Sequence, residues 1–282
     1  MADDLPLSFR PLAELPAAEA AAAFNRCFAG YLVSVQTSAE EFERRFRGED
    51  LDPFASGLFL DGDGVPFAVL LVTRRGWTAR VAAFALLPAS RGRGLGRRAM
   101  EAAVAAARAR GDRSLVLEVI EGNAPAVRLY EGLGFVRRRR LVGYHRPARP
   151  APAAAPALEE VDPQEVARLV ALEGAPGLPW MLAAETLARA VPPQRAYALD
   201  GAAYAIIGDP ARPAVPVRTL LVRRSRRGEG LARRLLDGLD ARHPGHSWGV
   251  TAIVPEDLVP GFFAATGWTP MEISQFEMVL AL

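Results

Sequence analysis

The spacing of hydrophobic and polar residues predicts helices and strands that alternate along the chain. Apolar residues recur at helical spacing over Ala17–Phe28 and Ala39–Phe46, and Ser38 with Glu41 forms a capping box at the start of the second helix. Shorter apolar runs bounded by turn residues then indicate strands, interleaved with further helices. The expected strands are Leu58–Leu60, Val65–Val72, Arg80–Leu87, Leu115–Ile120 and a final strand after Phe135, and the expected helices are Arg97–Arg110 and Pro125–Gly132.

The second half of the chain repeats this order in shorter pieces. Helical patterns cover Pro163–Glu173 and Ala183–Ala190, a hairpin turn is expected at Asp200-Gly201, and an apolar run over Thr219–Val222 precedes a glycine-rich loop and another helix. Because the repeating unit spans about half of the chain, which is far longer than a solenoid repeat, it indicates a duplicated α/β unit.

A segment rich in proline and alanine separates the two halves. It reads PARPAPAAAP over residues 147–156, and its prolines prevent a packed helix. We therefore expect a first domain at 1–146, a linker at 147–157 and a second domain at 158–282. Each domain is predicted to be a mixed, mostly antiparallel twisted sheet flanked by helices.

Composition argues against several classes of partner. The chain has 282 residues, half of them hydrophobic, and its 34 basic residues, all arginine, nearly balance 32 acidic ones. This balance gives no large field for nucleic acid or an anionic membrane, so neither is expected as a partner. No apolar run approaches the roughly 20 residues of a membrane span, and the N-terminus lacks a basic signal-peptide start, so we expect a cytoplasmic protein.

Cys27 is the only cysteine and the three histidines lack partners at ligand spacing, so no disulfide and no metal are expected.

Two glycine-rich loops are the strongest chemical signal. Arg91–Gly96 reads RGRGLG and Arg227–Ala232 reads RGEGLA, and each lies between an apolar run and a helix. Glycines let successive backbone N–H groups turn toward one anion, and a helix N-terminus adds unpaired N–H groups and a positive dipole end. The spacing matches neither a P-loop nor a dinucleotide fingerprint. A pyrophosphate site is therefore expected, and the alternative is an exposed turn with solvated arginines.

Further motifs follow the first loop in a fixed order. They are Leu86-Leu87-Pro88 before the loop, a long helix after it, the strand Leu117-Glu118-Val119, then Glu121-Gly122-Asn123-Ala124-Pro125-Ala126, and finally Leu129-Tyr130 with Gly134-Phe135. In this order and spacing the residues resemble the GNAT superfamily of acyl-CoA-dependent N-acyltransferases, in a tandem two-domain version. The resemblance covers about residues 5–145 well and 158–282 more loosely.

The resemblance implies a binding site for acetyl-CoA in the first domain. Its pantetheine arm is expected to pair with the strand backbone, and its pyrophosphate with the loop. Asn123 is expected to hydrogen-bond the cofactor, and its alternative role is a helix N-cap. The implied binding residues are Phe84, Ala85, Leu86, Arg91, Gly92, Arg93, Gly94, Leu95, Gly96, Arg97 and Asn123.

The resemblance also implies an N-acetyltransferase mechanism. Tyr130 matches the tyrosine that protonates the departing thiolate, and its alternative role is an aromatic core anchor. Glu118 stands where some relatives carry the carboxylate that takes a proton from the amine, and its alternative is a solvated, outward-facing strand residue. Because Arg80–Leu87 contains no carboxylate, the base is Glu118, Glu121 or a water chain.

The second half departs from the motif at the reacting positions. Alignment through Gly267-Trp268 puts Phe263 at the tyrosine, Glu256 at the asparagine and Thr251 at the glutamate, so this half is expected to be degenerate. Two alternatives stay open: a tandem enzyme that is active in its C-terminal half, and a non-catalytic CoA-binding sensor or scaffold.

The acceptor is expected to be a primary amine, with a small molecule favoured over a protein. The resemblance implies that the first two helices and their loop build its pocket. The aromatics there are Phe28, Tyr31 and Phe42, which are equally compatible with an ordinary core.

Overall fold

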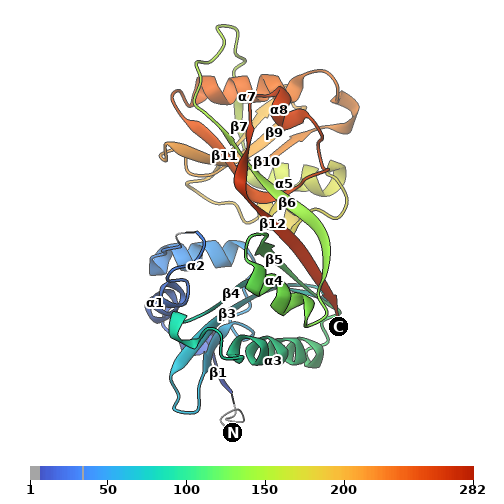
Figure 1. The fold of residues 1–282 in the computed structure, drawn as a ribbon. Helices are drawn as coiled ribbons and strands as arrows, with labels where there is room; N and C mark the ends of the chain where they lie inside the picture. Colours follow the sequence, from blue (N-terminus) through green and yellow to red (C-terminus); the bar gives the residue numbers. More distant parts are fainter. Residues whose placement is uncertain (1–6, 34) are drawn as a thin grey trace. The chain divides into compact units, whose positions relative to one another are not determined.

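A computed structural model describes residues 7–33 and 35–282 and divides the chain into two compact units (Figure 1). The first unit comprises Met1–Arg138 with Phe276–Leu282, and the second comprises Arg139–Gln275. Each unit is a sheet flanked by helices. This confirms the predicted α/β class and the two GNAT-sized units.

The first unit follows the predicted order of elements. Its strands are β1 (Ser8–Pro11), β2 (Gly57–Leu60), β3 (Pro66–Arg75), β4 (Thr78–Leu86), β5 (Ser114–Ile120) and the start of β6 (Val136–Arg146), and its helices are α1 (Ala17–Cys27), α2 (Ala39–Gly48), α3 (Leu95–Ala109) and α4 (Ala124–Glu131). The predicted capping box is present. The Glu41 N–H donates to Ser38 Oγ at 3.1 Å, and the Ser38 N–H donates to Glu41 Oε2 at 3.2 Å.

Helices cover both faces of this first sheet (Figure 1). The strand order is β1-β2-β3-β4-β5-β12, and β4 and β5 run parallel. Alternate residues of β3 point to opposite faces, as strand geometry requires. Leu70 and Val72 join the core under α3 and α4, whereas Val69 and Leu71 join the core under α1 and α2.

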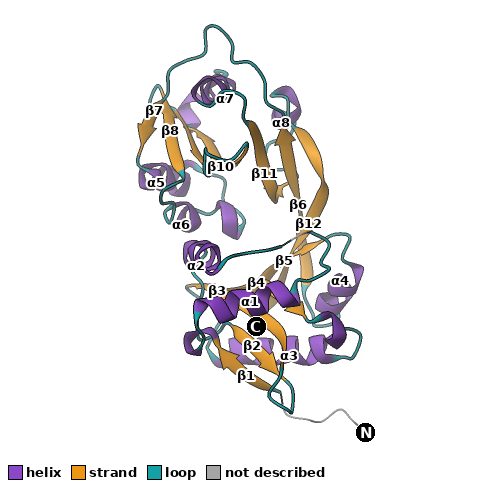
Figure 2. Ribbon diagram, turned by 90° about the vertical axis from the view of Figure 1, so that its left-hand side faces the viewer, coloured by secondary structure: helices purple, strands orange, loops and turns teal. Residues whose placement is uncertain are grey.

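The second unit has the same layered plan (Figure 2). Its strand order is β6-β11-β10-β9-β8-β7, with α7 packed on one face and α5 and α6 on the other. The helix expected over Ala183–Ala190 is shorter, since α6 covers only Ala184–Leu187, and a 3-10 turn at Trp180–Leu182 precedes it. The elements are β7 (Glu159–Val161), α5 (Pro163–Glu173), α6 (Ala184–Leu187), β8 (Arg195–Leu199), β9 (Ala203–Ile207), β10 (Ala214–Val222), α7 (Leu231–Arg242), β11 (Ser247–Pro255), α8 (Phe262–Ala265) and β12 (Thr269–Ala281).

The units divide at a different place from the expected boundary at 146/147. Strand β6 begins in the first unit, but from residue 139 it belongs to the second, where Arg146 is buried and forms a two-bonded ion pair with Asp240 at 2.8 and 2.6 Å. Strand β12 begins in the second unit and ends in the first, where its Met278 and Leu280 lie in the core. The proline-rich segment follows β6 without helix or strand over 147–158. An alternating apolar and polar pattern predicts a strand with one buried face, but it does not specify which of the two sheets the strand joins.

The C-terminal strand should therefore stabilise the first unit. Met278 is fully buried, so Met278→Ala is expected to reduce the free energy of unfolding by about 2–5 kcal/mol. Hydrogen exchange should show the lost protection in β4 and β5. Ile273→Ala is the matched control on the same strand, since its side chain is 37% exposed, and a change within about 0.5 kcal/mol is expected. Loss of protection confined to β8–β10 would contradict the assignment of β12 to the first unit.

Candidate functional site

The parallel strands β4 and β5 separate part-way along their length. They are paired from Thr78/Ser114 to Val81/Leu117, and no pair joins them further along in the described residues. Beyond that point β4 continues to Leu86, paired only with β3 on its other edge. The edge that faces β5 therefore has backbone groups that an extended ligand can pair with, and the predicted binding residues Phe84, Ala85 and Leu86 lie in this stretch of β4.

The loop after β4 has the conformation expected of an anion site. A 3-10 turn at Pro88–Ser90 leads into Gly92 and Gly94, whose φ angles are +73° and +76°, and α3 begins immediately afterwards at Leu95. A Cβ atom added at either glycine would meet nothing within 4 Å, so the surface there is open. The N–H groups of Leu95 and Gly96 precede the first hydrogen bonds of α3 and are available to an anion, whereas the Arg97 N–H donates to Gly94 O at 3.1 Å. These backbone groups fit a pyrophosphate.

The arginines of this loop have different roles. Arg91 Nε donates to Leu86 O at 3.2 Å, and its Nη2 donates to Cys27 O at 3.1 Å and Ala29 O at 3.0 Å. Its guanidinium therefore fastens the loop to the end of α1, while its charge stays beside the loop. Arg97 Nη1 donates to Gly132 O at 3.2 Å, so it bridges α3 to the end of α4. Arg93 is exposed. Of the predicted residues, the backbone amides are the groups best placed for an anion.

Asn123 caps α4, which bears out its alternative role. Its Oδ1 accepts the Ala126 N–H at 3.4 Å. Asn123 lies in the turn that follows the separated end of β5. Burial raises the pKa of Tyr31 and the Asn123 side chain lowers it, so the two side chains are neighbours.

The aromatic residues between α1 and α2 divide into two groups. Phe28 and Phe42 are buried around Phe24 in the core under these helices and are packing residues. Tyr31 is half-buried, packs edge-on against Phe28 and lies near Asn123. Of the three predicted acceptor aromatics, only Tyr31 has a polar group near the predicted site.

Tyr130 lies on α4, buried in the first unit's core with its ring 5.8 Å from that of Phe135. Burial raises the pKa of its phenol well above the usual range, and the neighbouring Tyr31 adds to this effect. The hydroxyl is therefore protonated throughout the neutral range. Anchoring and proton donation are compatible roles for such a residue.

Glu118 is buried in a charge cluster, which contradicts the alternative of a solvated, outward-facing residue. Both of its carboxylate oxygens accept from Arg80 Nε, at 3.1 and 2.8 Å, and Arg80 Nη1 donates to Glu49 at 2.9 Å. Glu118 is also the first β5 residue beyond the last β4–β5 pair. The Arg80 guanidinium is thus shared by two buried carboxylates, and Glu49 also pairs with Arg45 Nε at 3.2 Å.

The two carboxylates of this cluster are shifted in opposite directions. Burial raises the pKa of Glu118, and Glu277 and Glu49 raise it further against the lowering effect of Arg80. Burial also opposes ionisation of Glu49, but Arg80 together with Arg45 lowers its pKa. Glu118 is therefore the carboxylate better suited to take up a proton. Arg80 and Glu49 were not predicted, although an arginine inside an apolar strand was a signal that a carboxylate lies opposite.

Comparison with known proteins bears on the first unit. Residues 19–135 match the model of the Acetyltransferase (GNAT) family. The match confirms the predicted GNAT resemblance over these residues and indicates an acyltransferase domain, in a family that uses acetyl-CoA. A search of curated proteins finds no match.

Solved structures show that the GNAT fold extends over both units. The GCN5-related N-acetyltransferase from Sphaerobacter thermophilus is 19% identical, with 99% of this chain and 97% of that chain covered and a TM-score of 0.71. A tandem GNAT protein from the clavulanic acid biosynthesis pathway is 20% identical, with 98% of both chains covered and a TM-score of 0.65. The predicted tandem arrangement is confirmed.

The second GNAT-like unit repeats the geometry of the first. Its parallel strands β10 and β11 are paired only from Ala214/Ser247 to Pro216/Gly249. Gly228 and Gly230 have φ angles of +84° and +75°, and α7 follows. Arg227 repeats the contacts of Arg91, because its Nε donates to the end of β10 and its Nη2 to Glu173 O, at the end of α5.

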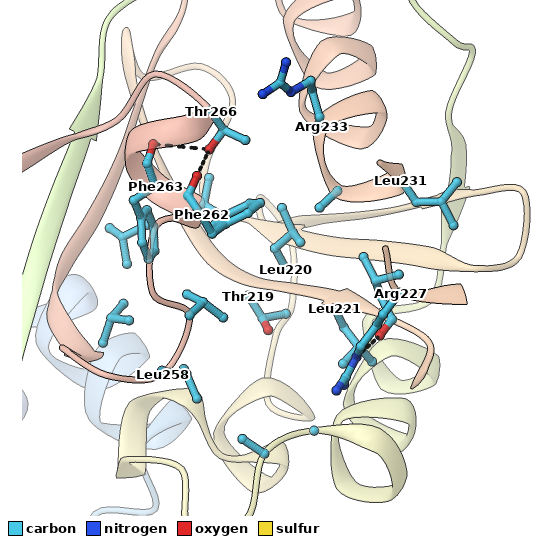
Figure 3. Close-up of a pocket in the computed structure, with 18 of the residues that line it drawn as sticks. Thr219, Leu220, Leu221, Arg227, Leu231, Arg233, Leu258, Phe262, Phe263 and Thr266 are labelled. Atoms are coloured by element: carbon cyan, nitrogen blue, oxygen red, sulfur yellow. Dashed lines mark hydrogen bonds between the residues drawn. The ribbon is translucent and has the colours of Figure 1, made fainter. Parts of the chain in front are cut away.

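The reacting positions of the second unit differ, as the sequence indicates. Phe263 is stacked on Tyr144 with ring centroids 3.6 Å apart, Glu256 is ion-paired with Arg140 at 2.7 Å, and Thr251 is exposed. A cavity of about 580 Å³ nevertheless lies beside the β10–α7 loop, and Figure 3 shows Phe262 and Phe263 across it from Arg227.

Other classes of site were also sought in the described part of the chain. Within residues 7–33 and 35–282, no three His, Cys, Asp or Glu side chains gather as ligands for a metal. No helix in the same ranges has both the length and the apolar character of a membrane span.

Arg80 should be essential to the stability of the first unit. Arg80→Met leaves Glu49 and Glu118 buried without their shared cation, and the expected loss is about 3–5 kcal/mol in the free energy of unfolding, measured by urea denaturation at neutral pH. The matched control is Arg44→Met, whose ion pair with Glu40 is exposed and should contribute less than about 1 kcal/mol. Equal losses in the two variants would contradict the role of the cluster.

Proposed function

We propose that the first unit transfers an acetyl group from acetyl-CoA to a primary amine of a small molecule by direct attack. The observation that carries this proposal is the separation of β4 from β5 beside the glycine loop, within a GNAT acetyltransferase domain. The free edge of β4 would pair with the pantetheine arm, and the amides of 92–96 would hold the pyrophosphate, with Arg97 beside them. Acetyl-CoA supplies the thioester in this scheme.

The reaction requires two proton transfers. The amine nitrogen attacks the thioester carbonyl carbon, the carbon–sulfur bond breaks, and the new amide retains the acetyl group. We assign the proton of the attacking amine to Glu118, directly or through water, because its raised pKa favours proton uptake. We assign protonation of the departing thiolate to Tyr130, because burial keeps its phenol protonated.

A small amine is proposed as the acceptor. Tyr31 is the one predicted acceptor aromatic with a polar group, and the near-balance of 34 basic and 32 acidic residues gives no strongly charged docking surface for a macromolecular acceptor.

The assignment of Tyr130 predicts a specific kinetic defect. Tyr130→Phe removes the proton donor but keeps the ring in its core position, so kcat is expected to fall by about 10²-fold or more. The affinity for CoA, measured by calorimetry, should change little. Tyr144→Phe, in the second unit, is the matched control and should leave acetyl transfer unchanged. Full turnover by Tyr130→Phe would reject the assignment.

The assignment of Glu118 predicts a pH effect. A base acts only when it is deprotonated, so kcat/KM should fall as the pH drops through the raised pKa of Glu118, above the usual value of about 4.3 for glutamate. Glu118→Gln should lower kcat/KM and remove this acidic limb, while Glu121→Gln should retain it. An acidic limb that persists in Glu118→Gln would assign the base elsewhere.

A non-catalytic CoA sensor is the alternative function, and the cavity of the second unit favours it for that half. Release of free thiol from acetyl-CoA, followed with a panel of small amines, separates the two. CoA binding without thiol release from any amine would favour the sensor.

A further inference from the structure

The cavity of the second unit has a wall that is mostly apolar. Leucine, valine and phenylalanine side chains from β10, β11, α8 and the segment after α5 line it, and the described residues of its wall include no aspartate, glutamate or histidine. Its volume of about 580 Å³ lies within the range of roughly 300–1,000 Å³ that is typical of small-molecule sites. A molecule that enters it gains free energy because apolar surface is removed from water.

The arginines of the cavity wall already have partners in the protein. Arg227 and Arg233 donate to backbone carbonyls, and Arg226 is ion-paired with Glu229 at 2.8 Å. Arg218 also has an interaction partner within the chain. Apart from these arginines, the described residues of the wall carry no charged side chain. Burying an unpaired charge is costly, so the interior favours an uncharged molecule.

Three aromatic rings form one part of the wall, and Figure 3 shows two of them, Phe262 and Phe263. Phe263 makes edge-on contacts with Phe262, at a centroid distance of 5.5 Å, and with Trp268, at 5.8 Å. Tyr144 covers one face of Phe263. Aromatic rings pack well in edge-to-face and offset arrangements, so this cluster favours a ligand that carries a ring of its own.

One polar group in this aromatic part of the wall has no partner. Trp268 is only 4% exposed, and its indole N–H has no hydrogen-bond partner among the described residues. Another buried indole of the same unit differs, because the Trp248 N–H donates to Asp240 Oδ1 at 2.9 Å. An unmade hydrogen bond of a buried donor costs free energy. Indole can only donate, so the ligand that relieves this cost must bring an acceptor atom.

We propose that this cavity binds an uncharged aromatic molecule that carries a carbonyl group. The ring of the ligand packs against Phe262, Phe263 and Trp268, and its carbonyl oxygen accepts the Trp268 N–H. The rest of the ligand fills the aliphatic interior. The ligand has no phosphate and is not held by the backbone amides of the loop before α7. This site goes beyond the acetyl transfer proposed for the first unit and uses none of its residues.

The test measures binding of three probes to the full chain by calorimetry. Butyrophenone is an uncharged aromatic ketone, butylbenzene lacks the carbonyl, and 4-phenylbutyrate carries a negative charge. Butyrophenone is expected to bind, and 4-phenylbutyrate to bind roughly tenfold more weakly, because a carboxylate loses its hydration in an apolar interior. No binding of butyrophenone, or equal or tighter binding of 4-phenylbutyrate, would overturn the proposal.

A change at Trp268 tests the hydrogen bond. Trp268→Phe keeps a ring and removes the donor, so it should weaken butyrophenone about fivefold and butylbenzene by less than about twofold. Trp248→Phe is the matched control, because the Trp248 ring does not line the cavity, and it should change neither affinity by more than about twofold. Circular dichroism checks that both variants are folded. Equal weakening of the two probes by Trp268→Phe would overturn the proposal.

A second pair of variants locates the probe. Leu258 lines the cavity and is partly buried, so Leu258→Trp should fill part of it and weaken butyrophenone roughly tenfold or more. Leu172→Trp, at a side chain that is exposed and outside the wall, should change binding by less than about twofold. Undiminished binding in Leu258→Trp would place the probe elsewhere and overturn the proposal. Tyr130→Phe should leave butyrophenone binding unchanged, so failure of this site and failure of the proposed acetyl transfer are separable.

Discussion

The separation of two parallel strands is the constraint on which the rest of the first unit depends. While β4 and β5 are paired, their backbone groups satisfy each other, and beyond Val81/Leu117 they do not. Unpaired strand edges within a sheet are costly unless another group covers them. The same separation lies beside the start of α3, and Glu118 is the first residue beyond the last pair. The binding edge, the anion loop and the buried carboxylate are therefore all found where the pairing of β4 with β5 stops.

The two units use the same device to hold their loops. Arg91 and Arg227 each reach back from the loop to the carbonyl at the end of the preceding strand and to carbonyls at the end of a helix across the sheet. A guanidinium suits this role because its donors form a planar fork and it keeps its charge. The loop is thus shaped before any ligand arrives, which reduces the entropy that binding must offset. The units differ in what lies beyond the loop: a buried phenol in the first, and an apolar cavity with a stacked Phe263 in the second.

Local features of this chain could be predicted from its sequence, and long-range ones could not. The capping box at Ser38, the helix after Gly94 and the hairpin strands follow from the spacing of nearby residues, and the structure has them. The partner of Glu118 is Arg80, 38 positions away, so the sequence around Glu118 alone does not distinguish a solvated residue from a buried ion pair. The exchange of β6 and β12 was missed for a similar reason, since either sheet can satisfy an alternating strand. The cavity in the second unit arises from side chains of several elements and has no local signature.

The place of β12 has a consequence for how the protein is made. Residues 276–282 follow the whole second unit in the chain, yet Met278 and Leu280 belong to the core of the first unit. Domains commonly fold in order as they emerge from the ribosome. Here the first unit cannot complete its core until the second unit has also been synthesised, so the two units do not fold strictly one after the other.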